Sequence, residues 1–327
     1  MLHERPTTRL APSPTGSLHL GNARTFAINH ALAVQGGWRV VLRIEDLDGP
    51  RVKPEAVAGI QQTLQWLGIT WEGQALVQSA ELGPCVEAMR HLVRDRRAFP
   101  CELSRSQIEA AVSAPQEGDA ASGFGKEVTF PPHLRPREWQ AQFDPADERT
   151  NWRFINDAGA VAFVDQVAGP QQIDPSATIG DFIIWTKRRV PAYQLAVVVD
   201  DHRQNVTHIV RGDDLLDSAA RQLLLYRALG FGPEPHYTHL PLVVGQDGRR
   251  LAKRHGDSRI DMYREIGVPP GAILGLIAFW SGVMAPGAPR RMISMAEFVA
   301  AFRLSILPSS KVVFTQEDDA WLRSCAQ

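Results

Sequence analysis

A glycine-containing segment near the N-terminus combines residues that can bind a negatively charged group. The segment APSPTGSLHLGN, residues 11–22, runs from a proline-stiffened turn into a helix expected to begin at His19. The first N–H groups of a helix have no partner within it, and the helix dipole leaves partial positive charge there. Gly21 would let a ligand approach the backbone, while His19 and Asn22 can donate hydrogen bonds to phosphate oxygens. On these residues alone, an anion site and an ordinary helix start are equally good interpretations.

A second segment, DGRRLAKRHGD at residues 247–257, is rich in cations. It places Arg249, Arg250, Lys253 and Arg254 in a loop flanked by glycines. A basic loop on its own is usually solvated surface. Opposite a helix N-terminus in an α/β fold, it would instead form a mobile clamp on a triphosphate. The two segments together therefore predict a nucleotide site.

The segments around these motifs predict a doubly wound parallel α/β sheet. Strand, glycine-containing turn, helix and strand, in that order, are how such a sheet begins, and NVTHIVRGDDLLDSAARQLLLYRALG predicts a second strand and helix that complete it. We expect strands at 8–11, 38–48, 152–155, 161–165 and 182–186. We expect the helix that opens at His19 to continue over 23–35, and further helices at 54–67, 80–97, 105–112, 260–266, 270–282 and 295–302. Residues 113–126, which are rich in Ala, Gly, Ser and acids, predict a mobile loop.

The composition is that of an ordinary folded protein. At 327 residues the chain exceeds the roughly 250 to 300 at which a single core stops growing, so a large domain with a smaller one is expected. The net charge of −1 provides no bulk positive field, so a nucleic acid would have to bind a local patch. We expect a cytoplasmic protein without a membrane segment, because no apolar run reaches ~18 residues and no secretion signal is recognisable. Cys85, Cys101 and Cys325 are widely spaced and are expected to be reduced thiols.

The motifs resemble those of class I aminoacyl-tRNA synthetases in their glutamyl branch. RLAPSPTGSLHLGN is similar to the first signature of that class, and RRLAKRH stands where the class carries its second signature. LRIEDLD, PAYQLAVVVDD and HIVRGDDLL also resemble the glutamyl branch, so the resemblance extends from Arg9 to His255. Asn22 replaces the second histidine of the generic first signature. Of the second signature only the key Lys253 is retained, with Ala252 where a serine is usual.

This resemblance implies a Rossmann-like, doubly wound parallel sheet with an inserted α+β subdomain and a short helical C-terminal region. The implied divisions are 1–98 for the first half of the catalytic domain and 99–190 for the inserted, acceptor-type subdomain. Residues 191–257 would form the second half with the signature loop, and 258–327 the helical region without an anticodon-binding domain.

The resemblance also implies a pocket for glutamate, whose two carboxylates and one ammonium call for cations and an acid. Arg9 and Arg211 match the family's arginines for the side-chain carboxylate, and planar guanidinium groups suit carboxylates. Tyr193 would add a hydroxyl, and Glu45 with Ser13 would hold the α-amino group. Each residue alone has an ordinary structural interpretation; it is their joint placement that matches the family. The implied glutamate-binding residues are Arg9, Ala11, Ser13, Glu45, Tyr193 and Arg211.

The implied reaction is attack by the glutamate carboxylate on the α-phosphate of ATP, with Mg²⁺ accompanying the nucleotide. Catalysis would come from positioning and charge stabilisation, without a nucleophile from the protein. His19 and Lys253 are the implied catalytic residues, with Arg250 and Arg254 as helpers for Lys253. The implied ATP-binding residues are Pro12, His19, Gly21, Asn22, Arg250 and Lys253.

The acceptor is suggested by the length of the chain after the second signature. The 72 residues from Gly256 to Gln327 are too few for the anticodon-binding region of a glutamyl-tRNA synthetase. The chain thus resembles the truncated paralogues, the glutamyl-queuosine tRNA synthetases. This implies a monomer that transfers glutamate to the queuosine base in the anticodon of tRNA(Asp), which would enter the site flipped out of its loop.

The resemblance further implies that no structural zinc is bound. Relatives often hold zinc with a Cys-x-Cys pair and a later Tyr-x-x-x-Cys. Here Cys101 is retained, but Leu103, Phe130 and Leu134 stand at the other positions. One remaining ligand cannot build a tetrahedral site.

Two other functions stay open at this stage. The chain could be a truncated glutamyl-tRNA synthetase that charges another tRNA, or a non-catalytic tRNA-binding paralogue. The presence of His19, Glu45, Tyr193, Arg211 and Lys253 argues against the latter. The basic clusters at 187–189 and 290–291 are candidate contacts with an RNA backbone, although either one alone is more simply solvated surface.

Overall fold

The computed structural model describes most of the chain. The described residues are 5–47, 49, 52, 54–112, 129–139, 142–249, 251, 258–285 and 287–326. The predicted mobile loop at 113–126 lies outside them, as do Arg250, Lys253 and Arg254 of the predicted cationic clamp.

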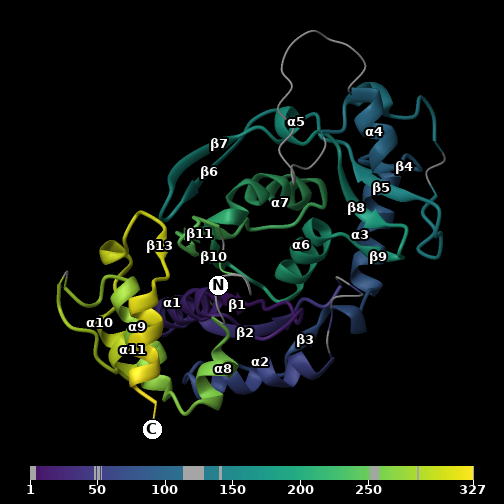
Figure 1. The fold of residues 1–327 in the computed structure, drawn as a ribbon. Helices are drawn as coiled ribbons and strands as arrows, with labels where there is room; N and C mark the ends of the chain where they lie inside the picture. Colours follow the sequence, from purple (N-terminus) through teal and green to yellow (C-terminus); the bar gives the residue numbers. More distant parts are fainter. Residues whose placement is uncertain are drawn as a thin grey trace.

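A seven-stranded sheet runs through the middle of the molecule (Figure 1), in the strand order β3-β2-β1-β10-β11-β6-β7. The strands are β1 Thr7–Leu10, β2 Arg39–Ile44, β3 Leu76–Val77, β6 Val161–Asp165, β7 Gly169–Ile173, β10 His208–Gly212 and β11 His236–Leu240. Neighbouring strands are parallel except for β6 and β7. The order reverses between β1 and β10, and open α/β sheets bind ligands outside the carboxyl ends of their strands at such a point. The turns after β1 and β10 therefore lie where a ligand is expected.

Helices lie between the strands along the chain. They are α1 Leu20–Gly36, α2 Pro54–Trp66, α3 Gly83–Arg94, α4 Arg105–Val112, α5 Pro175–Thr178, α6 Tyr193–Arg203 and α7 Leu216–Ala228. Helix α1 contacts β1, β2 and β10 and also contacts the C-terminal helices α9 and α10. Because it is covered on both sides, most of its first three turns are buried, polar Asn29 and His30 included. This burial fixes the position of the N-terminal end of α1 relative to the sheet.

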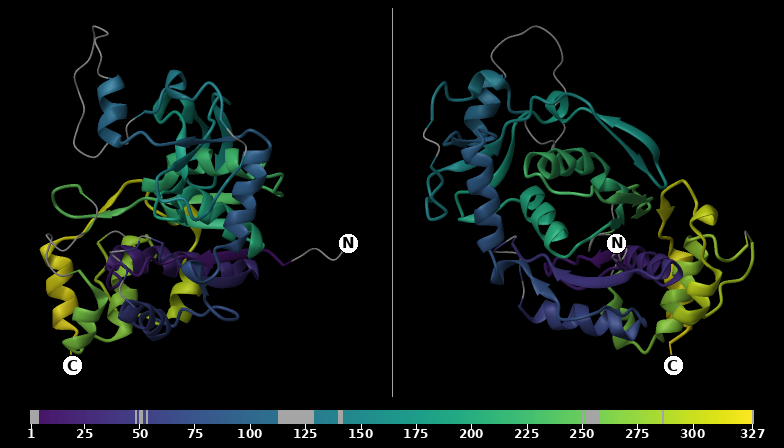
Figure 2. Two further views of the ribbon diagram at one scale, coloured as in Figure 1. Left: turned by 90° about the vertical axis from the view of Figure 1, so that its right-hand side faces the viewer. Right: turned by 180° about the vertical axis from the view of Figure 1, so that it is seen from behind.

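A smaller antiparallel sheet lies beside the large one (Figure 2) in the order β4-β5-β8-β9. Its strands are β4 Ala98–Cys101, β5 Asn151–Phe154, β8 Phe182–Thr186 and β9 Val190–Pro191. Buried aromatic residues, among them Trp152, Phe154 and Trp185, share one hydrophobic cluster with α3, α6 and α7. The smaller sheet is therefore packed against the helices α3 and α6, which contact β4 and β8.

The C-terminal part consists of the helices α8 Ile260–Glu265, α9 Pro270–Trp280, α10 Met295–Ala301 and α11 Gln316–Ser324. A short parallel pair, β12 Val243–Val244 with β13 Val312–Val313, joins it to the chain that follows β11. Arg24 of α1 is buried and donates hydrogen bonds to the Pro241 carbonyl (2.6 Å) and to Ser281 Oγ (3.3 Å). The end of β11, the start of α1 and the end of α9 are thereby held together.

The predicted α/β class is confirmed, and several elements match their predicted bounds. Strands β6 and β8 and helix α4 begin and end where predicted. Strand β2 is shorter than the predicted 38–48, because Glu45 and Asp46 leave the sheet for the turn beside the pocket. Helix α6 was not predicted, since its apolar run AVVV looks as much like a strand. The proposed domain divisions stay a prediction; β6 and β7, at 161–173, extend the large sheet.

No helix within the described ranges combines the length and hydropathy that a bilayer-crossing segment requires.

Candidate active site

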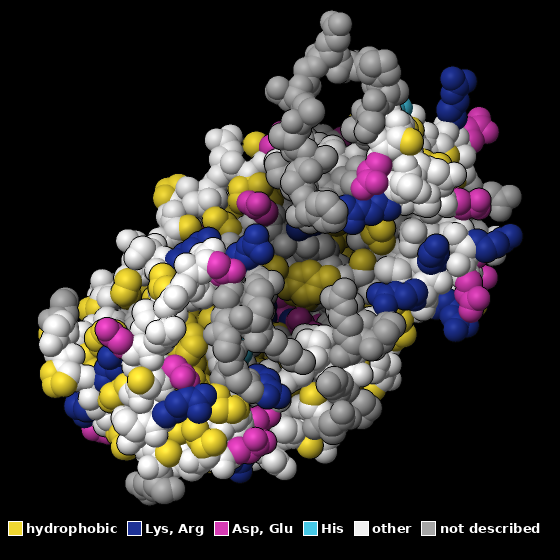
Figure 3. All heavy atoms as spheres, viewed as in Figure 1, with side chains coloured by type: hydrophobic (Ala, Val, Ile, Leu, Met, Phe, Trp, Pro, Cys, Tyr) yellow, Lys and Arg dark blue, Asp and Glu magenta, His cyan; other side chains and the backbone are white. Residues whose placement is uncertain are grey.

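A pocket of about 620 Å³ lies at the point where the strand order reverses. Figure 3 shows the molecule hollowed between its two lobes, with hydrophobic and acidic side chains at the floor of the hollow. The pocket is lined by the turn from β1 to α1, the ends of β2, β10 and β11, and the start of α6. The structure brings together these residues predicted for the site: Arg9, Ala11, Pro12, Ser13, His19, Gly21, Asn22, Glu45, Tyr193 and Arg211. Their roles as ligands for substrate stay predictions.

The remaining predicted site residues, Arg250 and Lys253, lie outside the described part of the chain. Leu251 and Ser258, which flank 252–257 in sequence, both line the pocket. Two backbone hydrogen bonds tie Ser258 and Ile260 to the first signature: Leu20 N–H to the Ser258 carbonyl (3.0 Å) and Ile260 N–H to the Leu18 carbonyl (2.9 Å). The chain that follows residues 252–257 is thus anchored at the start of α1.

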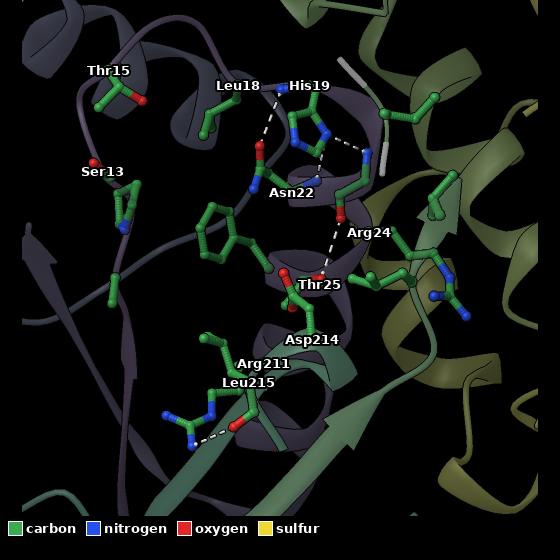
Figure 4. A pocket seen from close by; sticks show the side chains of 18 of the residues that line it. Ser13, Thr15, Leu18, His19, Asn22, Arg24, Thr25, Arg211, Asp214 and Leu215 are labelled. Carbon is green, nitrogen blue, oxygen red and sulfur yellow. Dashed lines mark hydrogen bonds between the residues drawn. The ribbon is translucent and has the colours of Figure 1, made fainter. Parts of the chain in front are cut away.

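The start of α1 differs from the expectation of open N–H groups. His19 is the N-cap, and its Nδ1 accepts from the N–H groups of Gly21 (3.1 Å) and Asn22 (3.3 Å). The Asn22 side chain in turn accepts from the His19 N–H at 3.4 Å, which completes a capping box (Figure 4). With Leu20 bonded to Ser258 and Ala23 to the His19 carbonyl, all four leading N–H groups have partners. An anion here would therefore meet the helix dipole and the side chains rather than open backbone donors.

The hydrogen bonds of this cap determine which ring nitrogen of His19 carries the proton. Because Nδ1 accepts from two N–H groups, a neutral His19 carries its proton on Nε2. Gly21 gives the ring room, since a Cβ there would lie 3.1 Å from His19 Cε1 and Nδ1, which is a crowded contact, and 3.5 Å from Val243 Cβ. The glycine thus accommodates the His19 ring, a more local reason than the predicted room for ATP.

A buried ionic cluster lies beneath the opposite end of the pocket. Asp201 Oδ1 accepts from Arg43 Nη1 (2.6 Å) and from Arg9 Nε (3.2 Å). Arg43 also contacts Glu45 Oε1, through Nη2 at 3.1 Å and Nε at 3.3 Å. The side chains of Arg9, Arg43 and Asp201 are at most 4% exposed, whereas Glu45 is 14% exposed and lines the pocket. The cluster therefore presents Glu45 to a ligand while neutralising the charges below it.

Arg9 retains binding capacity in this cluster. Asp201 accepts a hydrogen bond from Nε of Arg9. Within the described ranges, neither Nη group of Arg9 has a hydrogen-bond partner. Burial raises the pKa of Glu45, although the charges of Arg43 and Arg9 oppose the rise. A ligand ammonium placed beside Glu45 would favour its ionised form, because an opposite charge stabilises a carboxylate.

Arg211 is held at the same end of the pocket by three hydrogen bonds. Nε donates to His239 Nε2 (2.9 Å), Nη1 to Gln222 Oε1 (2.8 Å) and Nη2 to the Leu215 carbonyl (3.2 Å). The side chain is buried but lines the pocket. In Figure 4, Arg211 and Leu215 lie at one end of the pocket and His19 and Asn22 at the other. The cavity therefore has a guanidinium end and a helix-start end.

Several supporting residues escaped the sequence analysis: Arg43, Asp165, Asp201, Gln222 and His239. Arg43 and Asp201 lie inside the quoted segments LRIEDLD and PAYQLAVVVDD, so charged residues within apolar runs were the available signal. His239 and Asp165 gave a weaker signal, since each is a polar residue near the end of a strand and only Asp165 stands alone in an apolar one. Their partners lie far away in sequence, and only the strand order brings them together.

The positions compared with zinc ligands form an apolar cluster. Phe99, Cys101, Ile108, Phe130 and Ile155 are buried together, and Leu103 and Leu134 pack against them. Over the residues that the structure describes, no group of three or more His, Cys, Asp or Glu side chains could hold a metal ion. The absence of zinc stays a prediction, for which this apolar packing gives a physical reason.

Comparison with known proteins identifies relatives over nearly the whole chain. Residues 6–321 match the family model for the catalytic domain of class I tRNA synthetases (E and Q). A glutamyl-Q tRNA(Asp) synthetase of Rhodopirellula baltica is 46% identical over 84% of this chain and 84% of its own length. One of Symbiobacterium thermophilum is 40% identical over 96% of this chain and 97% of its own.

Glutamate–tRNA ligases are also similar. Glutamate–tRNA ligase 2 of Syntrophus aciditrophicus is 34% identical over 98% of this chain, which covers 66% of that protein. Among solved structures, the glutamate tRNA ligase of Elizabethkingia meningosepticum in complex with its amino acid superposes with a TM-score of 0.78 at 25% identity. That match covers 98% of this chain and 69% of the other.

Proposed function

The chain belongs to the class I tRNA synthetases (E and Q) and is a ligase, and we propose that it activates L-glutamate with ATP and transfers it to queuosine in the anticodon of tRNA(Asp). The observation that carries the first half of this proposal is the charge arrangement of the pocket. Arg9, Arg211 and Glu45 lie toward one end of the cavity, Asp214 also lines it, and the capped start of α1 lies at the other end. These ends suit an acidic amino acid and a nucleotide, respectively.

Glutamate recognition is assigned to the guanidinium end. The side-chain carboxylate would bind the free Nη groups of Arg9 and the pocket side of Arg211, because guanidinium groups pair well with carboxylates. Glu45 and Ser13 would accept the α-ammonium, with Ala11 lining the pocket beside them and Tyr193 at the mouth, where its side chain is 40% exposed. Glutamine would offer one acceptor oxygen and an NH₂ donor to the same cations, which leaves a guanidinium donor unpaired.

Activation is assigned to the region between the two ends. An oxygen of the glutamate α-carboxylate would attack the α-phosphorus of ATP, and the bond to pyrophosphate would break. His19, Gly21, Asn22 and Pro12 line the cavity where the nucleotide would lie. Lys253 and Arg250 would stabilise the charge on the leaving pyrophosphate. Mg²⁺ would enter on the ATP phosphates as part of the substrate.

The second half of the proposal concerns the acceptor. A hydroxyl of the queuosine base would attack the acyl carbon of glutamyl-adenylate and release AMP. Support comes from the relatives named glutamyl-Q tRNA(Asp) synthetase, which match along 84% and 97% of their own lengths. A single-stranded loop with a splayed base is a common form in which RNA enters a pocket. Such a reaction would take place in the cytoplasm, where charged tRNAs are used, and a monomer would suffice for it.

A second candidate acceptor is a glutamate tRNA, since ligases with that name are 34% to 40% identical to this chain. The test is to incubate the protein with ATP, labelled glutamate and purified tRNAs with and without queuosine. Label on queuosine-containing tRNA(Asp) alone is the expected result. Label on glutamate tRNA would favour the second candidate, and the absence of label from every tRNA would contradict both.

A further inference from the structure

We propose that Asp165 and His239 are positioning residues for Arg211, and that they set the direction in which its guanidinium faces the pocket. The inference deepens the proposed function, because it rests on Arg211 as the ligand of the glutamate side chain. It rests on three adjacent strands of the large sheet that place Arg211, His239 and Asp165 in a row.

The row follows from the register of the strands. Arg211 on β10 lies directly opposite His239 on β11 in the parallel pairing. Asp165, the last residue of β6, pairs with Tyr237, two residues before His239. The side chains complete the row: Arg211 Nε lies 2.9 Å from His239 Nε2, and His239 Nδ1 lies 2.7 Å from Asp165 Oδ2. Asp165 and His239 are fully buried, so solvent does not compete for these bonds.

The hydrogen-bond roles in the row can be assigned. An arginine Nε can only donate, so His239 Nε2 must be an acceptor without a proton. The ring proton then belongs on Nδ1, where it is donated to Asp165 Oδ2. Asp165 also accepts backbone N–H groups from Val167, Ala168 and His239, all within 3.3 Å. The carboxylate is therefore fixed and selects one tautomer of a neutral His239.

The consequence for Arg211 concerns which of its donors remain for a ligand. His239, Gln222 and Leu215 take one N–H from each guanidinium nitrogen. One N–H on each Nη group is left, and a carboxylate can accept such a pair. Gln222 is itself held, since its Nε2 donates to Gln194 Oε1 at 3.0 Å. If His239 no longer accepted from Nε, the guanidinium could rotate and the remaining pair would no longer face the ligand.

The tautomer gives a test that does not depend on activity. Nitrogen NMR of the full-length protein near neutral pH distinguishes a ring protonated on Nδ1 from one protonated on Nε2 or on both. The His239 signal is identified by its loss in His239→Gln. We expect a neutral ring with the proton on Nδ1, and an Nε2-protonated or doubly protonated ring would overturn the inference.

Two substitutions at His239 separate positioning from general stability. In His239→Gln the amide oxygen can take the place of Nε2 and accept from Arg211. In His239→Asn the shorter amide can still donate to Asp165 but does not reach Arg211. His236→Gln, on the same strand but exposed, is the matched control. By calorimetry we expect His239→Asn to weaken glutamate binding about 10-fold or more, the effect of losing a charge-assisted contact, with ATP binding unchanged. His239→Gln should bind glutamate nearly as the wild type does.

The outcomes separate this inference from the proposed function. Equal glutamate affinity in both His239 variants would overturn the positioning role, as would parallel losses of glutamate and ATP binding. If the wild type binds no glutamate, the proposed function fails. In that case the tautomer measurement still decides whether Asp165 and His239 hold Arg211 as described.

Discussion

At the scale of single residues, the pocket separates the side chains that would touch a ligand from those that hold them. Arg9 and Arg211 each donate a hydrogen bond to a buried partner, which is Asp201 for Arg9 and His239 for Arg211. A long flexible side chain loses rotamer entropy when it binds a ligand, and one that is already fixed has less to lose. The buried partners would therefore favour both affinity and selectivity for the proposed acidic amino acid.

The role of Glu45 can be tested by removing its charge. Glu45→Gln should weaken glutamate binding by about 10- to 100-fold, because a charge-assisted contact to the ammonium contributes about 1.5–3 kcal/mol. ATP binding should be unaffected. Calorimetric titration with each substrate measures this, with Glu72→Gln as the control, since Glu72 is exposed and pairs with Arg5 on the surface. An unchanged glutamate affinity would remove Glu45 from the ammonium site.

The residues that could be predicted were those inside motifs. Arg9, Ser13, His19, Glu45 and Arg211 belong to segments whose pattern is recognisable, and all of them line the pocket. Their supporting residues could not be predicted in the same way. Asp165 and His239 are 74 residues apart, and their contact exists only because β6 and β11 are neighbours in the sheet.

At the scale of elements, the start of α1 is the best-defined part of the site. The sequence predicted a helix there but not its cap, since a histidine side chain is not among the preferred N-cap residues. The ring accepts two backbone N–H groups, and Asn22 closes the capping box from the other side. The helix start is thereby made rigid before any nucleotide binds.

Gly21→Ala tests whether this cap matters for the nucleotide. The added Cβ would crowd the His19 ring at 3.1 Å, so we expect a higher KM for ATP together with a change in stability of no more than ~1 kcal/mol. The control is Gly59→Ala in α2, where a Cβ meets nothing within 4 Å. That change should stabilise the protein by roughly 0.5–1 kcal/mol without altering KM. An unaltered KM in Gly21→Ala would show that the ring position is not important for ATP.

The apolar cluster around Cys101 gives a prediction about metal and stability. Phe130 is fully buried and lies beneath the Arg153 guanidinium at 4.2 Å. Phe130→Ala should therefore lower the free energy of unfolding by about 3–5 kcal/mol.

A chelator should leave the thermal midpoint of the wild type unchanged. Elemental analysis that finds one zinc per chain, or a midpoint that falls on chelation, would contradict the prediction.

At the scale of the whole molecule, the fold class could be predicted from the sequence, but the pairing of strands that are distant in sequence could not. The alternation of strands and helices and the two signatures predicted the α/β class and a nucleotide site at the start of the first helix. The pairing of β6 with β11 could not be predicted, because it joins segments separated by α6 and α7 and rests on one register pair. The same is true of β12 with β13, which ties the C-terminal part to the site.

His208, the first residue of β10 in the large sheet, should make the stability of the protein depend on pH. Burial and the neighbouring His236 lower the pKa of His208 to about 4, while the unfolded chain keeps about 6.5. Between these values the unfolded state binds more protons, so the stability contributed by His208 is lost as the pH falls from about 6.5 towards about 4. His208→Phe keeps the stacking on Trp38 and should lose less stability than the wild type between about pH 7 and about pH 5. Urea unfolding at both pH values measures this, and equal losses would contradict it.

The proposed transfer of glutamate to an anticodon base is tested by finding where on the tRNA the glutamate is attached. After reaction with ATP and labelled glutamate, queuosine-containing tRNA(Asp) is digested with a nuclease and the fragments are analysed by mass spectrometry. We expect the mass of a glutamyl group on the anticodon fragment and an unmodified 3′-terminal fragment. Glutamate on the 3′-terminal adenosine, or on neither fragment, would contradict the account.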